Sequence, residues 1–278
     1  MIKRSSFLTV IIFHLVGISV LSAQTAHTGQ LLSADTIVVH KVMIIPFKPD
    51  NYFSDADVEL AQKNEKNVTD LSTLFRYGLN YNISAHVISS YGAYNILNDT
   101  TVQSQEDLRL IYSSVTYRYE KPLGVDPDDT SSDHTIHQKD LFGRGEEEQP
   151  AEEEKKITLK KDKVESTGAE KYLNAVVTKP EIFSTLHDQY GADLFLFVNQ
   201  FELVTNYMHC LDRTKNYFER KVVVHYSIYN VDGIQLKGDA VTVTFSSSET
   251  DIDAIIGQQF PIIADYLSQS LYNSADQP

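Results

Sequence analysis

The 278-residue chain contains one cysteine, Cys210, and no tryptophan. A single thiol cannot form an intramolecular disulfide, so the fold must be stabilised by a packed core. Basic residues are also few: 24 Lys and Arg stand against 38 Asp and Glu, which gives a net charge of −14. Because phosphate contacts need clustered Lys and Arg, we expect no nucleic-acid partner.

Two sequence patterns of common catalytic sites are missing as well. The chain has neither a Gly-x-Ser-x-Gly nucleophile elbow nor a Gly-rich phosphate loop. We therefore interpret the protein as non-enzymatic and assign it no catalytic residue and no cofactor. Two alternatives stay open: a small-ligand carrier, and a hydrolase or metal-dependent enzyme whose site is assembled from residues far apart in the sequence.

The N-terminus has the order of a signal peptide. Two basic residues precede an apolar run from Phe7 to Leu21, and small residues ending at Ala23 precede Gln24. As a helix this run would rise only about 22 Å, less than the roughly 30 Å hydrocarbon core of a bilayer. We expect cleavage of residues 1–23 between Ala23 and Gln24, and no membrane span afterwards.

The expected compartment follows from the same region. Gln24 stands where a bacterial lipoprotein has its acylated cysteine, so no lipid anchor is expected. An exported protein without disulfides fits a bacterial periplasm, and three N-glycosylation sequons keep a secreted eukaryotic protein as the alternative. Loss of residues 1–23 removes two basic residues and makes the net charge −16.

The rest of the chain divides by composition. Residues 24–35 are polar and predict a flexible lead-in, and residues 36–273 predict one globular domain. A charged insertion at residues 124–168 interrupts this domain. Its part from Asp126 to Glu154 carries eleven acidic residues against two basic ones and few apolar side chains. This composition is typical of a disordered segment.

The apolar pattern predicts alternating helices and strands. Strands are expected at 37–47, 94–97, 193–198, 219–231 and 240–245, and helices at 67–89, 104–115, 180–190 and from 250 onward. The run at 193–198 is continuously apolar, as in a central strand covered on both faces. Gly191 should end one helix and Asp232-Gly233 should turn between two antiparallel strands. Pro261 should kink the last helix.

This order predicts a mixed α/β domain with helices packed on a single mixed sheet that ends in an antiparallel C-terminal meander. Two stretches, Val42–Phe47 and Tyr190–Val198, resemble the periplasmic domain of the curli-secretion lipoprotein (CsgG-like) family and of activators of penicillin-binding proteins. The resemblance implies the soluble fold and a role as a binding or assembly module of the bacterial cell envelope. The chain departs from the family in lacking the lipobox cysteine. The insertion also lacks the alternating apolar pattern of a membrane hairpin, so no pore is implied.

Several groups of polar residues could carry chemistry. His209, Cys210 and Asp212 are possible metal ligands, but a closed zinc site needs about four ligands, so we interpret them as a polar crossing between strands with a free thiol. His134 and His137 lie inside the charged insertion, where nothing would fix coordination. We expect no metal.

The remaining polar groups have structural explanations. Carboxylate pairs such as Asp55 with Asp57 and Asp251 with Asp253 sit at expected helix starts. His225 lies in an expected strand in which apolar residues alternate with others, so we interpret it as a half-buried histidine with a structural role.

A partner surface is expected in the segment from Lys48 to Asp57, which leaves the first strand at its C-terminal end. Tyr52 and Phe53 are large apolar residues in this polar stretch. They could be exposed anchors for an envelope protein or for self-association, since aromatic residues are enriched in binding hot spots. The alternative is that both rings fold back over the neighbouring helix as a lid.

Overall fold

A computed structural model describes residues 40–122, 164–166 and 171–275. The expected signal peptide, the cleavage site at Ala23 and Gln24, the lead-in at 24–35 and most of the insertion at 124–168 lie outside the described residues. His134 and His137 lie outside them too.

The helices and strands alternate along the chain. In chain order they are β1 (Lys41–Ile45), η1 (Pro49–Asn51), β2 (Tyr52–Ser54), α1 (Asp57–Lys63), α2 (Val68–Val87), β3 (Gly92–Asn95), α3 (Val102–Ser113), β4 (Val115–Glu120), β5 (Val164–Ser166), β6 (Tyr172–Val177), α4 (Glu181–Tyr190), β7 (Leu194–Asp212), β8 (Tyr217–Asn230), β9 (Gln235–Ser246) and α5 (Ile252–Ala275).

The main sheet is mixed, as the sequence predicts. Its strands follow the order β3-β1-β7-β8-β9-β5, and β2 pairs with β7 further along the same edge as β1. Strands β1, β2 and β3 run parallel to their neighbours, while β7, β8 and β9 form the antiparallel meander expected at the C-terminal end. The predicted α/β class and C-terminal meander are confirmed.

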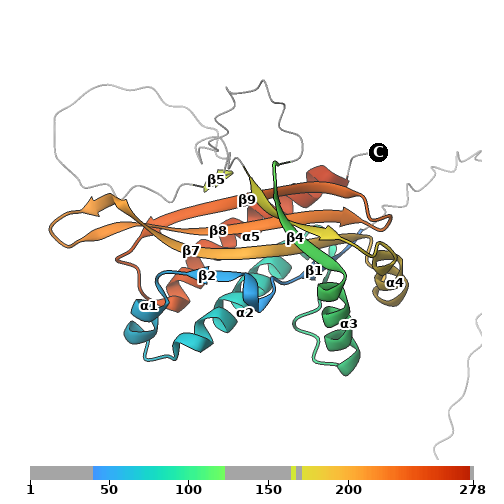
Figure 1. The fold of residues 1–278 in the computed structure, drawn as a ribbon, viewed down its shortest axis with the longest axis horizontal. Helices are drawn as coiled ribbons and strands as arrows, with labels where there is room; N and C mark the ends of the chain where they lie inside the picture. The colour runs from blue at the N-terminus through green and yellow to red at the C-terminus, as the bar shows by residue number, and fades with distance from the viewer. Residues whose placement is uncertain (1–39, 123–163, 167–170, 276–278) are drawn as a thin grey trace, which may run out of the picture. The chain divides into compact units, whose positions relative to one another are not determined.

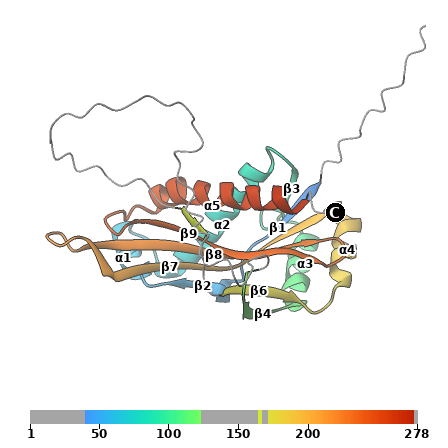
Figure 2. The ribbon, with the colours of Figure 1, turned by 90° about the horizontal axis from the view of Figure 1, so that it is seen from above.

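Two layers of side chains cover this sheet. Helices α2 and α5 lie on one face (Figure 2), where Leu71, Phe75 and Ile263 belong to the larger apolar cluster. Helices α3 and α4 and strand β6 lie on the other face, around Phe183 and Phe195. The run 194–198 alternates between the two clusters, so β7 is the central strand covered on both faces.

A second, two-stranded sheet was not expected from the sequence. Strands β4 and β6 pair antiparallel from Val115↔Val177 to Glu120↔Tyr172, although more than fifty residues separate them in the chain. The predicted helix at 104–115 ends earlier, because Val115 already belongs to β4. Within the charged insertion the structure describes only Val164–Ser166, which pair with β9.

Local signals place several boundaries correctly. Gly191 ends α4 in the left-handed conformation with φ 66°, and Gly233 has φ 75° in the turn between β8 and β9. The Asp251 carboxylate accepts the backbone N–H of Asp253 at 2.9 Å and so caps α5, which continues through Pro261. None of the helices in the described ranges is long and apolar enough to cross a membrane.

Candidate functional site

Strands β7 and β8 extend past the rest of the main sheet as a two-stranded arm, Asn206–Tyr217 (Figure 1). The pairing of β2 with β7 ends at Ser54↔Leu203, and that of β9 with β8 ends at Glu219↔Ser246. Within the described residues, no third strand pairs with the arm. Its side chains are therefore available on both faces of the ribbon.

The arm carries exposed apolar side chains at an irregularity of its strand pairing. Asn206 pairs with Glu219 and Cys210 pairs with Phe218, so the three residues between them on β7 have no cross-strand partner. Such a bulge redirects side chains and terminates regular pairing. Met208 is 96% exposed and Tyr207 is 64% exposed. Leu211, which lies at a second register shift between Cys210 and Asp212, is exposed as well.

Polar contacts order the arm around these apolar residues. The Asp212 carboxylate accepts the backbone N–H groups of Thr214 at 2.9 Å and Lys215 at 3.2 Å, which closes the turn. The His209 Nδ1 lies 3.0 Å from a carboxylate oxygen of Glu219 on the other strand. The Tyr207 ring packs edge-on against the ring of Phe218, with centroids 5.4 Å apart.

These contacts separate the candidate ligands His209, Cys210 and Asp212. His209 contacts Glu219, Asp212 holds the turn, and Cys210 is a free, partly exposed thiol. Across the ranges that the structure describes, no three His, Cys, Asp or Glu side chains are grouped so that they could hold a metal ion.

A group of four polar side chains, which we call the clamp, fixes the root of the arm. The Asp55 carboxylate accepts the backbone N–H of Thr205 at 3.0 Å and its hydroxyl at 3.1 Å. Arg220, the cross-strand partner of Thr205, donates from Nε to the Thr205 hydroxyl at 3.2 Å and from Nη2 to Glu59 at 2.7 Å. The Arg220 side chain is only 2% exposed. The clamp therefore joins both strands of the arm to α1 and to the chain just before it.

The expected partner segment, Lys48 to Asp57, contains a 3₁₀ turn and the short strand β2 rather than a loop. Unpaired N–H and C=O groups along β7 explain the strand, because β2 adds to that edge where β1 has ended. Asp55, which we expected at a helix start, belongs to the clamp, and Asp57 is the first residue of α1.

Tyr52 and Phe53 have different surroundings. Tyr52 stacks on Phe201 with ring centroids 5.5 Å apart, and its hydroxyl donates to Asp57 at 2.6 Å. Burial, and next the Asp57 carboxylate, raise the pKa of the Tyr52 hydroxyl far above its ordinary value. The Tyr52 ring is thus folded back against the domain, as in the alternative in which it acts as a lid. Phe53 is 53% exposed and stays a candidate anchor.

His225 is more buried than expected and links three strands. Its Nδ1 accepts the backbone N–H of Leu173 at 2.9 Å, so the ring proton lies on Nε2, which is 3.4 Å from Glu202. The hydrogen bond from His225 lowers the pKa of the Glu202 carboxyl. The histidine therefore ties β6 to β8, which is a structural role.

The sequence analysis missed the arm as a site, although it carries a signal. A strand usually has five or six residues, but here apolar residues continue much further, through Tyr207, Met208 and Leu211, to the turn at Asp212.

In comparisons with known proteins, no protein-family model, no curated protein and no solved structure matches this chain.

Proposed function

We propose that this protein is a non-enzymatic binding or assembly module of the bacterial cell envelope, and that it contacts a partner protein through the tip of the arm. The observation that carries the proposal is the exposure of Tyr207, Met208 and Leu211 on a ribbon whose root is fixed by the clamp. Exposed apolar groups that are grouped together mark interaction surfaces, whereas single ones are ordinary.

The chemistry of the tip suits a protein surface. Methionine adapts to irregular apolar surfaces, and tyrosine is enriched among binding hot spots. Asp212, Arg213 and Lys215, which follow in the turn of the arm, bring charges of both signs close to the apolar residues in the sequence. An apolar centre with a polar rim is the usual composition of a protein–protein interface. Ordering of the arm by the clamp reduces the entropy that would be lost on binding.

The compartment is part of the same proposal. A basic start, an apolar run and a small residue at position 23 support export, and the CsgG-like resemblance supports a role in the envelope. We expect protein isolated from its own cells to be soluble periplasmic material that begins at Gln24. Intact-mass measurement tests this, and an acylated product or retention of residues 1–23 would contradict it.

Three substitutions test the binding surface directly: Tyr207→Ser, Met208→Ser and Leu211→Ser, made together. A matched control replaces three exposed apolar residues outside the arm: Val58→Ser in α1, Ile88→Ser just after α2 and Val102→Ser in α3. We expect the arm variant to keep the melting temperature of the unchanged protein but to capture at least about tenfold less of its envelope partner. The control variant should keep both the melting temperature and the amount of partner captured. Equal capture by the arm variant would contradict the proposal.

A further inference from the structure

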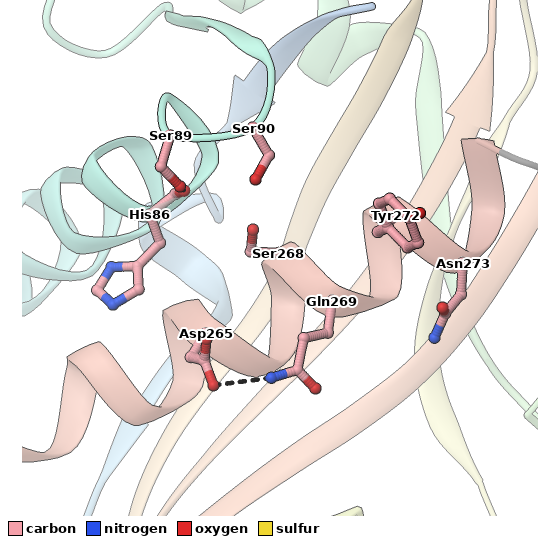
Figure 3. A pocket seen from close by; sticks show the side chains of 8 residues that line it. All are labelled: His86, Ser89, Ser90, Asp265, Ser268, Gln269, Tyr272 and Asn273. Atoms are coloured by element: carbon pink, nitrogen blue, oxygen red, sulfur yellow. Dashed lines mark hydrogen bonds between the residues drawn. The ribbon is translucent and has the colours of Figure 1, made fainter. Parts of the chain in front are cut away.

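A pocket of about 350 Å³ lies between the end of α2 and the exposed side of α5 (Figure 3). Helix α5 supplies a stripe of side chains three and four residues apart, from Asp265 to Asn273, which is one face of a helix. The last turn of α2 supplies His86, and the turn after it supplies Ser89 and Ser90. In Figure 3 the side chains of Ser90 and Ser268 point toward one another across the pocket.

The pocket is remote from the arm. Ser246 of β9 pairs with Glu219 at the root of the arm, and α5 begins six residues later, at Ile252. Since each residue of a helix adds about 1.5 Å, the last turns of α5 lie on the order of 30 Å further along the sheet. A ligand here would therefore not compete with a partner bound at the arm.

The lining is polar and has unused hydrogen-bonding capacity. Among the described residues, the side chains of Ser90, Ser268 and Asn273 have no hydrogen-bond partner. Gln269 donates from Nε2 to Asp265 at 2.9 Å, which holds an amide and a carboxylate side by side and leaves each with a free acceptor oxygen. The groups that line the pocket can thus both donate and accept.

One large ring stands at the side of this polar surface. Tyr272 is 60% exposed, one helical turn from Ser268 and Gln269. No aliphatic side chain lines the pocket, so an apolar ligand would find few contacts apart from this ring and the His86 imidazole. The only acidic group, Asp265, disfavours an anionic ligand.

We propose that this pocket binds a neutral saccharide. Sugar hydroxyl groups donate and accept hydrogen bonds, as the serine, asparagine and glutamine side chains here also do, and the C–H face of a sugar ring can stack on Tyr272. The volume lies near the lower end of the roughly 300–1,000 Å³ of small-molecule pockets, which suits one or two sugar rings. This site does not depend on the proposed function of the arm.

Amide chemical-shift titration of the purified protein in its native processed form tests the proposal. The probes are N,N′-diacetylchitobiose and maltose as neutral saccharides, inorganic phosphate as an anion and spermidine as a cation. We expect at least one saccharide to bind with a millimolar dissociation constant and to shift the amides of Asp265–Asn273 and Ser89–Ser90. Shifts from neither saccharide, shifts confined to other residues, or tighter binding of phosphate or spermidine would overturn it.

Variants of Tyr272 give the second measurement. Tyr272→Ala should weaken saccharide binding by about tenfold, whereas Tyr272→Phe should keep most of it because the stacking face remains. Tyr81→Ala is the matched control, since Tyr81 is an exposed tyrosine of α2 that does not line the pocket. Binding that Tyr272→Ala leaves unchanged, or that Tyr81→Ala weakens equally, would contradict the proposed contact. Loss of saccharide binding would leave partner capture by the arm intact, so the two proposals fail separately.

Discussion

Arg220 is the most buried charged group of the clamp, and its two partners do not contribute equally. Glu59 supplies the opposite charge, while Thr205 supplies one neutral acceptor. A buried charge without a partner is costly, whereas replacing the charge by an apolar side chain of similar volume is often tolerated. The Nη1 of Arg220 already has no partner among the described residues, which adds to the cost of burying this guanidinium.

We therefore predict that Glu59→Gln lowers the free energy of unfolding by about 1–2 kcal/mol, and that Arg220→Met lowers it by less. Urea denaturation of both variants measures the two losses. A larger loss for Arg220→Met than for Glu59→Gln would mean that the guanidinium contributes net stability through packing or further hydrogen bonds.

Glu202 gives a pH-dependent prediction. The hydrogen bond from His225 lowers the pKa of its carboxyl in the folded state, so its contribution to stability is fully present above the pKa of the unfolded chain, about 4.3, and is lost as the pH falls through the lower folded value. Glu202→Gln should cost on the order of 1 kcal/mol at pH 7 and progressively less below about pH 4. Melting temperatures of both proteins from pH 7 to pH 3 measure this, and a difference independent of pH would contradict it.

At the scale of elements, one close approach between β6 and the main sheet lies at a glycine. A Cβ atom added at Gly238 of β9 would lie 2.0 Å from the Tyr172 hydroxyl oxygen of β6, while one added at Gly257 of α5 would meet nothing within 4 Å. Gly238→Ala should therefore cost about 3 kcal/mol, and Gly257→Ala should gain about 0.5–1 kcal/mol from helix propensity. Denaturant unfolding of the pair measures both, and equal effects would show that β6 can shift freely.

Much of the element order follows from local sequence, because its signals are local. Gly191, the Asp232-Gly233 turn and the cap at Asp251 each act within a few residues, and each marks the expected boundary. The pairing of β4 with β6 could not be predicted in this way, because its partners are more than fifty residues apart. The alternation of Val115, Tyr117 and Tyr119 was its one visible signal.

The candidate sites were harder to predict than the fold. Tyr52 and Phe53 are adjacent in the sequence, but successive side chains of a strand point to opposite faces. The Tyr52 ring is therefore stacked on another ring, whereas the Phe53 ring is exposed. By its hydrophobicity alone Met208 would be expected in the core, but it is exposed because it lies in the arm, where no other described strand pairs with β7 and β8. The pocket joins the ends of two helices that are about 180 residues apart, so no local pattern indicates it.

At the scale of the whole molecule, we predict that tyrosines with raised pKa values limit stability at alkaline pH. Burial raises the pKa of Tyr112 and of Tyr172 from 10 to about 12 in the folded state. Their contribution is complete below pH 10, where the unfolded chain would also keep these protons, and is lost as the pH rises toward 12. When tyrosine ionisation is followed by absorbance, the native protein should therefore show a late step at high pH that accompanies unfolding. The protein unfolded in urea should lack this step. A single step near pH 10 in both conditions would contradict this burial.

The central claim for the whole molecule is that the arm tip, rather than another exposed apolar position, meets the partner. Site-specific photo-crosslinking in the intact envelope tests it most directly, with a photoreactive residue at Met208 and, as the control, at Val102, an exposed position on α3. We predict one discrete adduct from position 208, of a mass that identifies a second protein, and none from position 102. A dimer of this chain would reassign the surface to self-association. Equal adducts from both positions, or none from position 208, would contradict the account.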